Sequence, residues 1–232
     1  MRLSGHGGDA NTRAILVHMF HLQGSLLDDV DEIGLRPLAA TRRTPLADGA
    51  WVDVRPGWLT GADEVFAHLH ERVDWRAERR RMYDRDVDTP RLLRFYGAGE
   101  PLPHPVLREA REALSRHYAP KLGEPFVTAG MCLYRDGRDS VAWHGDDIGR
   151  SATHDTMVAI VSLGTPRPLL LRPVSDRARA EHRGGTLRFV VGHGDLVVMG
   201  GSCQRTWHHA IPKIAGAVGP RISVQFRPYD VR

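Results

Sequence analysis

Two short segments in the second half of the chain carry residues that together suit a metal ion. In the first, His144 and Asp146 are two positions apart, so on an extended backbone both side chains project to the same face. The second contains the adjacent histidines His208 and His209, and either can supply a third ligand from a distant strand. Two histidines and one carboxylate form a facial triad, which leaves open positions on iron(II) for a chelating co-substrate and dioxygen. This spacing predicts a catalytic metal site.

Two arginines near the C-terminus could bind the co-substrate that such a metal site needs. Arg221 and Arg227 flank an expected strand and are six residues apart, so both point to the same side of it. Iron in this role needs a co-substrate that supplies two electrons, and 2-oxoglutarate does so while chelating the metal. Its distal carboxylate then needs a cation, and arginine is the natural bidentate partner. Taken alone, however, a His-x-Asp pair is common by chance, and a structural zinc protein is an alternative interpretation.

The elements that must position these residues are short β-rich runs separated by Gly, Pro and Asp. Several runs at this spacing are typical of a sandwich or jelly roll. The expected strands cover residues 158–163, 169–171, 186–191, 196–199 and 222–226. The charged segment 175–185 is expected to be an exposed hairpin loop, because its only apolar residues are alanines.

The first half of the chain contains two helix patterns. One is expected to start at Thr60, which Asp63 follows three residues later. The other carries an apolar stripe from Leu107 to Tyr118 and is expected to end at Pro120 and Gly123. We expect a flexible extension over residues 1–18 and one domain over 19–232. Within that domain, 19–125 would form helical support and a substrate lid, and 126–232 the jelly-roll core.

Composition limits the class of protein without deciding its function. The chain has 232 residues, 41% hydrophobic and 26% charged, as expected of a folded globular protein. No apolar run approaches the roughly 20 residues that span a bilayer, and no secretion signal is recognisable, so we expect no membrane association. Two cysteines are too few for a disulfide framework, which favours a reducing cytoplasm. A net charge of +4 is compatible with a polyanionic partner but does not require one.

The order of several motifs between about Thr89 and Arg227 resembles the AlkB family of Fe(II)- and 2-oxoglutarate-dependent dioxygenases. These motifs are the segments 133–137, 139–147 and 192–196, then His209, then Pro220-Arg221 and Phe226-Arg227. The resemblance implies an α+β fold with a double-stranded β-helix core, N-terminal helices and a lid that covers the substrate. It also implies Fe(II), 2-oxoglutarate and O2 as cofactors.

Matched position by position, the resemblance implies roles for individual residues. The iron ligands, and hence the catalytic residues, would be His144, Asp146 and His209, with His209 preferred to His208. The positions that contact 2-oxoglutarate would be Tyr134, Arg221 and Arg227. Two departures stand beside them, because the family often has asparagine where this chain has Cys132 and Ser223. Cysteine is a poor hydrogen-bond partner, so we expect the co-substrate to bind more weakly or in a different arrangement.

The implied reaction is oxidative dealkylation of N-alkylated bases in DNA, with release of formaldehyde and succinate, by a monomer without an obligate protein partner. A base must leave the duplex to reach iron, so contacts from a base pocket and a lid are expected. The candidate substrate-binding residues are Asp147, Tyr96, Tyr83 and Arg81. The alternatives are the same chemistry on RNA, protein or a small metabolite, or a nucleic-acid-binding relative that has lost turnover. Such a loss of turnover would follow from the changes at Cys132 and Ser223.

Overall fold

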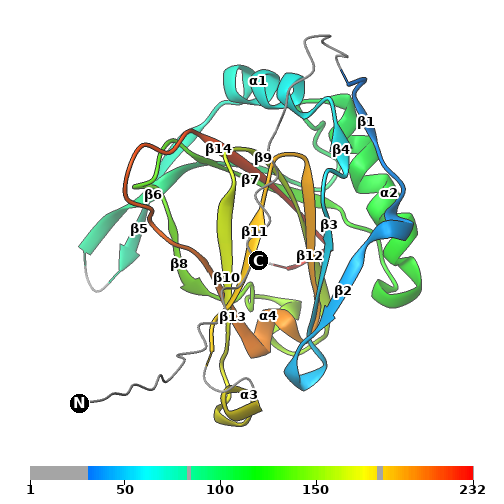
Figure 1. Cartoon of the computed structure of the whole chain (residues 1–232), viewed down its shortest axis with the longest axis vertical. Coiled ribbons are helices and arrows are strands. Elements are labelled where there is room, and N and C mark those ends of the chain that lie inside the picture. Colours follow the sequence, from blue (N-terminus) through cyan, green and yellow to red (C-terminus); the bar gives the residue numbers. More distant parts are fainter. Residues whose placement is uncertain (1–30, 83–84, 182–184, 232) are drawn as a thin grey trace, which may run out of the picture. The chain divides into compact units, whose positions relative to one another are not determined.

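The computed structural model describes residues 31–82, 85–181 and 185–231, and residues 31–232 form one compact unit. The extension expected over residues 1–18 lies outside the described residues. Most of the regular secondary structure is antiparallel β-strand, in two sheets that face each other (Figure 1). The expected jelly-roll architecture is confirmed.

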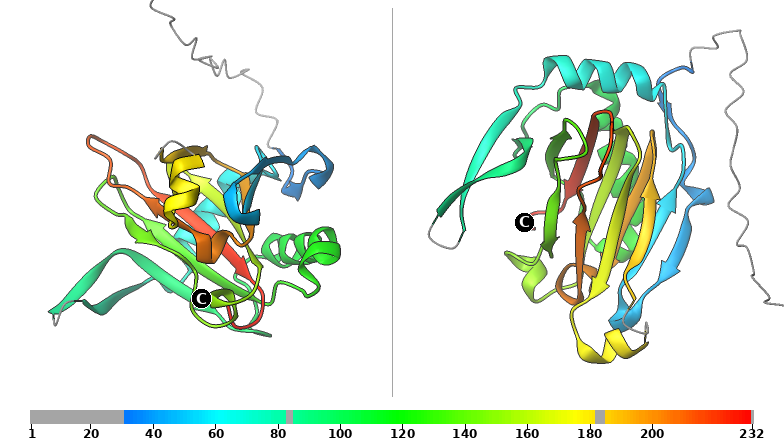
Figure 2. Two further views of the ribbon diagram at one scale, coloured as in Figure 1. Left: turned by 90° about the horizontal axis from the view of Figure 1, so that it is seen from below. Right: turned by 60° about the vertical axis from the view of Figure 1, so that its left-hand side comes forward.

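The larger sheet has eight strands, and the smaller has four. In spatial order the larger sheet contains β2 (Arg42–Pro45), β3 (Trp51–Arg55), β12 (Asp195–Gly201), β9 (Thr156–Gly164), β14 (Arg221–Arg227), β7 (Thr128–Tyr134), β6 (Arg85–Tyr96) and β5 (Arg76–Met82). The smaller contains β11 (Leu187–Val191), β10 (Arg167–Pro173), β13 (Trp207–Ile211) and β8 (Val141–His144). At one end of the large sheet the β5–β6 hairpin extends outward (Figure 2).

Strand β9 shows why this sequence makes a two-sided sheet. Its residues from Thr156 to Leu163 are all buried, a continuous run that is typical of a strand covered on both faces. Ala159 and Val161 face the core beneath the helices, whereas Val158 and Ile160 face the core between the two sheets. The molecule therefore has two hydrophobic cores, one on each face of the large sheet.

Two helices cover the outer face of the large sheet, α1 (Ala62–Arg72) and α2 (Pro105–Leu122). The expected helix start at Thr60 is wrong by one residue: Gly61 holds the cap position in the left-handed conformation, and the Thr60 hydroxyl donates to the Glu32 carbonyl. The expected stop at Pro120 is also wrong. The helix continues through Pro120 to Leu122, and Gly123, the other expected end, stops it with a left-handed conformation.

The description of residues 19–125 also needs correction. Residues before it contribute four strands to the large sheet, so they are not only helical support. In the segment expected to be a loop, α3 (Asp176–Glu181) forms because the Ser175 hydroxyl caps the Ala178 N–H and Ala178 is buried. The remaining elements are β1 (Gly34–Leu35), β4 (Leu59–Thr60), α4 (Cys203–Thr206) and three 3-10 turns, Leu38–Ala40, Ala47–Gly49 and Arg150–Ala152.

Among the described residues, no helix is both long and apolar enough to cross a membrane.

Candidate metal centre and co-substrate pocket

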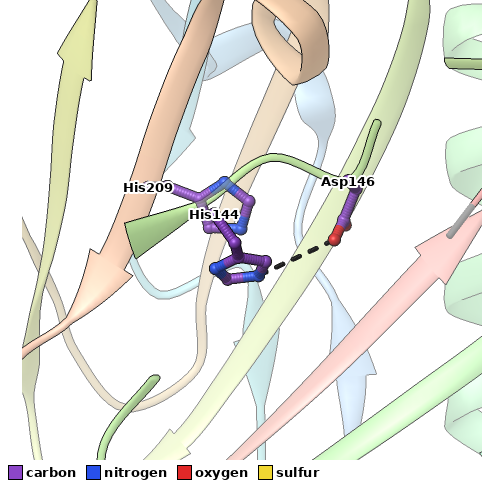
Figure 3. Close-up of side chains that lie close together, drawn as sticks. All are labelled: His144, Asp146 and His209. Carbon is purple, nitrogen blue, oxygen red and sulfur yellow. Dashed lines mark ion pairs between the residues drawn. The ribbon is translucent and has the colours of Figure 1, made fainter. Parts of the chain in front are cut away.

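Two histidines of the small sheet and an aspartate of the loop after β8 meet at the inner face of this sheet (Figure 3). His144 ends β8 and His209 lies in β13, where the two residues are direct partners across the strands, so their imidazoles share one face. Their ring centroids are 4.2 Å apart. Asp146 follows two residues after His144, and one ligand atom from each of the three residues lies within 4.8 Å of the others.

His208 projects to the opposite face. It pairs across the strands with Arg172 on β10, and Arg172 is exposed. The geometry therefore brings His209, and not His208, to Asp146 and His144.

The loop that carries Asp146 is held against α4. A side chain at Gly145 would begin 2.3 Å from the Gln204 carbonyl oxygen, so only glycine allows this approach. The Asp146 N–H lies 3.4 Å from the Gln204 side-chain oxygen, which accepts it in a long hydrogen bond. Gln204 thus supports the position of Asp146, a role that no spacing in the sequence suggested.

Hydrogen bonding also sets the orientation of His144. Its Nδ1 lies 2.9 Å from the carbonyl oxygen of Ala142. A carbonyl only accepts, so Nδ1 carries the proton and donates it. Nε2 is then left with its lone pair and faces Asp146, 3.8 Å from Oδ1. Metal-binding histidines are commonly oriented in this way.

The electrostatics favour the protonation states that a metal needs. Burial raises the pKa of Asp146, but the positive charge of Arg227 and the two neighbouring imidazoles outweigh burial and hold the pKa at about 2. Burial lowers the pKa of His209 to about 3, and the nearby His144 adds to this effect. An ionised carboxylate and a neutral imidazole are the states that bind a divalent metal.

Arg227 contacts the triad directly. Its Nε and Nη2 donate to Oδ2 of Asp146 at 3.1 and 2.8 Å. The other carboxylate oxygen remains directed toward His144. Arg227 also lines the pocket next to the triad, so the residue that we expected to contact the co-substrate has a second function, which is to orient Asp146.

Arg221 lies at the other end of β14 and is 2% exposed. Its Nε donates to the Ser162 hydroxyl at 3.0 Å, and its guanidinium lies over the ring of the buried Tyr134. Among the described residues, Nη1 has no hydrogen-bond partner and no carboxylate pairs with the guanidinium. Burial lowers the pKa of Arg221. A buried cation of this kind is costly unless it is paired, so the site fits a ligand that brings a carboxylate.

The pocket joins these groups into one cavity. It is lined by the three triad residues, by Arg91, Arg221 and Arg227, by the polar residues Cys132, Tyr134, Ser223 and Gln225, and by apolar residues of both sheets. The donor set therefore fits a metal at one end and a dicarboxylate along β14. Arg91 and Gln225 were not predicted from the sequence. Strand alternation offered a signal for Gln225, because alternate residues of a strand share a face and Gln225 alternates with Arg221 and Arg227.

Tyr96 is not at the site, contrary to our expectation. It is 7% exposed and packs in the core beneath the helices, with the Arg94 guanidinium 4.5 Å from its ring centroid. The neighbouring Phe95 pairs with Gly130, and a side chain at Gly130 would meet Arg227 and Gln225. Phe95 therefore projects to the pocket face and is 54% exposed. Adjacent aromatic residues on a strand face opposite ways, and the sequence does not say which faces inward.

The structure describes the other three candidate substrate residues to different extents. Asp147 is exposed, one residue after Asp146. Arg81 belongs to β5, but its side chain lies outside the described part of the chain. Tyr83 lies outside the described residues altogether.

Comparisons with known proteins agree with this geometry. Residues 62–227 match the family described as the 2OG-Fe(II) oxygenase superfamily. The chain is 30% identical over 219 residues to human "Alpha-ketoglutarate-dependent dioxygenase alkB homolog 3", covering 86% of this chain and 70% of the relative. It is 28% identical over 182 residues to human "DNA oxidative demethylase ALKBH2", covering 72% of this chain and 68% of the relative.

Solved structures resemble the fold. The structure of OsALKBH1 matches with a TM-score of 0.51 and 14% identity, over 81% of this chain and all of that one. An oxidoreductase of the 2OG-Fe(II) oxygenase family from Burkholderia pseudomallei matches with a TM-score of 0.50 and 12% identity, over 78% and 86% of the two chains. Together with the family match and the triad, these findings identify the chain as an AlkB-like member of the 2OG-Fe(II) oxygenase superfamily, a 2-oxoglutarate-dependent dioxygenase whose cofactors are Fe(II), 2-oxoglutarate and O2.

Proposed function

We propose that this dioxygenase removes N-alkyl groups from nucleobases in DNA. The observation that carries the proposal is one pocket that combines the His144, Asp146 and His209 cluster with a buried arginine, Arg221, which lacks an anionic partner among the described residues. A relative named as a DNA oxidative demethylase supports the choice of substrate.

His144, Asp146 and His209 are the proposed iron ligands. Bound there, Fe(II), 2-oxoglutarate and O2 would supply the oxidising power to hydroxylate an N-alkyl carbon, and a hydroxylated methyl group would then depart as formaldehyde and leave the nitrogen unmodified. The protein orients the metal ligands. Arg227 keeps one oxygen of Asp146 occupied and the other directed inward, and the Ala142 carbonyl fixes the tautomer of His144.

Arg221 and Tyr134 are the proposed partners of the distal carboxylate. Both are nearly inaccessible to water, at 2% and 3% exposure. A charge-assisted hydrogen bond is strong in such a setting, because little solvent competes with it. Apolar residues from both sheets, including Val158, Ile160 and Leu169, complete the lining of the pocket.

The substrate side is proposed to include Phe95 and Asp147. Phe95 presents an exposed ring on the pocket face, which suits stacking against an extruded base. Asp147 adjoins the metal cluster, where a carboxylate can accept from an exocyclic amine. The β5–β6 hairpin, whose sequence carries Arg81 and Tyr83, is the proposed lid over the nucleic acid.

The test is a turnover assay with N-methylated single-stranded and duplex DNA oligonucleotides, in which succinate and formaldehyde are followed together. We expect formaldehyde that depends on DNA, Fe(II) and 2-oxoglutarate, and none from the His144→Ala variant. Succinate without DNA-dependent formaldehyde would reject DNA dealkylation and redirect the search to RNA, protein or a small molecule. The same assay with matched RNA oligonucleotides then tests RNA as the substrate.

A further inference from the structure

Residues 228–231, which we call the C-terminal tail, turn back after β14 onto the loop that follows β8. Val231 forms an antiparallel bridge with Gly149 in this loop. One residue farther along the loop, the Arg150 N–H donates to the Asp230 carbonyl oxygen at 2.9 Å. Two successive backbone contacts therefore join the tail to the loop.

These contacts complete a closed ring of chain beside the proposed metal site. Gly149 comes three residues after Asp146, and Val231 comes four residues after Arg227. Asp146 and Arg227 are themselves joined, with 2.8 Å between Nη2 of the arginine and Oδ2 of the carboxylate. A loop that is joined to its neighbour at two points has fewer conformations than one joined at a single point. The tail thus restricts the positions that Asp146 can adopt relative to Arg227.

The approach of the tail to the loop requires a special backbone conformation on both sides. Gly149 has a φ of 80°, and a side chain there would collide with the Asp230 carbonyl oxygen, so only glycine allows the contact. Asp230 has a φ of 55°, in the left-handed region that residues other than glycine seldom adopt. Such a conformation persists where the surrounding contacts hold it. The docked tail is therefore a specific structure.

Burial anchors the tail at its far end. Val231 is 4% exposed and packs in the core between the two sheets, whereas Tyr229 and Asp230 before it are exposed. The loop is also held from another side, because Nη1 and Nη2 of Arg150 both donate to the Glu124 carboxylate, just after α2. The loop is thus fixed between the tail and the segment that follows α2.

We propose that the C-terminal tail positions Asp146 for metal binding, with Val231 as its anchor. This inference rests on Asp146 as a proposed iron ligand. Arg227 fixes one oxygen of the carboxylate, and the tail fixes the backbone that carries it. Without the docked tail, the free carboxylate oxygen would be directed at the two imidazoles for less of the time, so the metal would bind more weakly.

The test is Mn(II) binding to the full-length apoprotein, measured by isothermal titration calorimetry, with hydrogen exchange of the Arg150 amide followed on the same samples. Val231→Ala removes the anchor. Its matched control is Val52→Ala, which makes the same change in the same core, but on β3 and at a position outside the pocket lining.

A second variant releases the tail without a change in the core. Asp230→Pro cannot keep the left-handed conformation, because the proline ring fixes φ near −65°. Asp230→Gly is its matched control, since glycine adopts this conformation readily and keeps the carbonyl that Arg150 contacts. Asp146→Ala is measured beside these variants to test the ligand itself.

We expect Val231→Ala and Asp230→Pro to bind Mn(II) about 10- to 100-fold more weakly, the range typical of groups that orient a metal ligand. Exchange of the Arg150 amide should be faster in both. Val52→Ala and Asp230→Gly should bind Mn(II) as the wild type does.

Wild-type Mn(II) affinity in either tail variant would overturn the proposal. An equal loss in Val52→Ala and Val231→Ala would also overturn it, because the affinity would then follow the general stability of the core. Asp146→Ala separates the two possible failures. Wild-type affinity in Asp146→Ala would reject Asp146 as a ligand, whereas loss of binding there, with none in the tail variants, would reject the role of the tail alone.

Discussion

Two buried aspartates on opposite sides of the large sheet each pair with an arginine, but they differ in whether a carboxylate oxygen remains free of protein donors. Asp53, on β3 beneath α2, has both oxygens occupied: Arg43 donates to each at 2.7 Å, and the Tyr118 hydroxyl donates to Oδ2 at 2.9 Å. Asp146 receives both bonds from Arg227 on a single oxygen. Its other oxygen faces His144.

This difference separates a structural carboxylate from one prepared for a ligand. When all acceptor sites of a buried carboxylate are filled by protein donors, the pair stabilises the fold and has no capacity left. When one oxygen is left directed at two imidazoles, the carboxylate keeps a lone pair for a cation. The comparison predicts a loss of turnover for Asp146, whereas loss of Asp53 should affect stability alone.

The largest effect is expected for Asp146→Ala. Removal of a ligand should reduce turnover more than about 100-fold, the upper end for a residue that merely orients a ligand. The chain should still fold, but the free energy of unfolding should fall, because Arg227 is left without its carboxylate partner. Succinate formation, bound iron and circular dichroism measure the three quantities. Iron content equal to that of the wild type would reject Asp146 as a ligand.

Asp53→Ala is expected to lower stability and to leave turnover unchanged. Without the carboxylate, Arg43 and the Tyr118 hydroxyl lose their partner, and we expect the free energy of unfolding to fall by about 2–3 kcal/mol. This is below the usual cost of breaking a buried ion pair, since the Arg43 side chain is one-third exposed. Urea unfolding measures the loss. Turnover per folded molecule should stay near the wild-type value, and a large fall in it would contradict the division of roles.

Arg227→Met tests the pairing that distinguishes Asp146. The loss of both bonds to Oδ2 should lower the affinity for Fe(II) about 10- to 100-fold, as is typical for residues that orient a metal ligand. Methionine keeps most of the apolar stem, but the unfolding temperature of the apoprotein should fall, because the buried Asp146 carboxylate loses its arginine partner. Metal titration of the apoprotein gives the affinity. If Fe(II) binding were unchanged while 2-oxoglutarate binding fell, Arg227 would act on the co-substrate alone.

The sequence was sufficient to predict elements with strong local patterns. The run from Val158 to Leu163 is short and apolar at almost every position, which favours a buried strand, and it lies within β9. The triad was also predictable, because alternation places His144 and Asp146 on one face and the family motif selects His209. By contrast, β2 has no apolar pattern: its residues are Arg-Arg-Thr-Pro and all are exposed, so only its pairing with β3 identifies it.

Contacts between distant segments were beyond the reach of sequence reasoning. The Arg227–Asp146 pair joins β14 to the loop after β8, and the Gln225–Ser223–Cys132 contacts depend on the register between β14 and β7. The choice between Phe95 and Tyr96 depended on which face of β6 is inward. A shift of one residue in register reverses every such assignment, and nothing local to these segments fixes it.

The smallest effect is expected for Tyr118→Phe, which leaves the Asp53–Arg43 pair intact and removes one donor from Oδ2. The hydroxyl is buried and bonds to a charged acceptor, so its loss should cost about 1.5 kcal/mol, at the low end for such a bond because Arg43 still occupies the same oxygen. For a domain of this size, that corresponds to a fall of roughly 3–6 °C in the unfolding temperature. Calorimetry of the apoprotein and of the Fe(II)-loaded protein should give equal shifts, because Tyr118 lies beneath the sheet face that does not carry the metal. Unequal shifts would mean that the two aspartates are coupled through the large sheet.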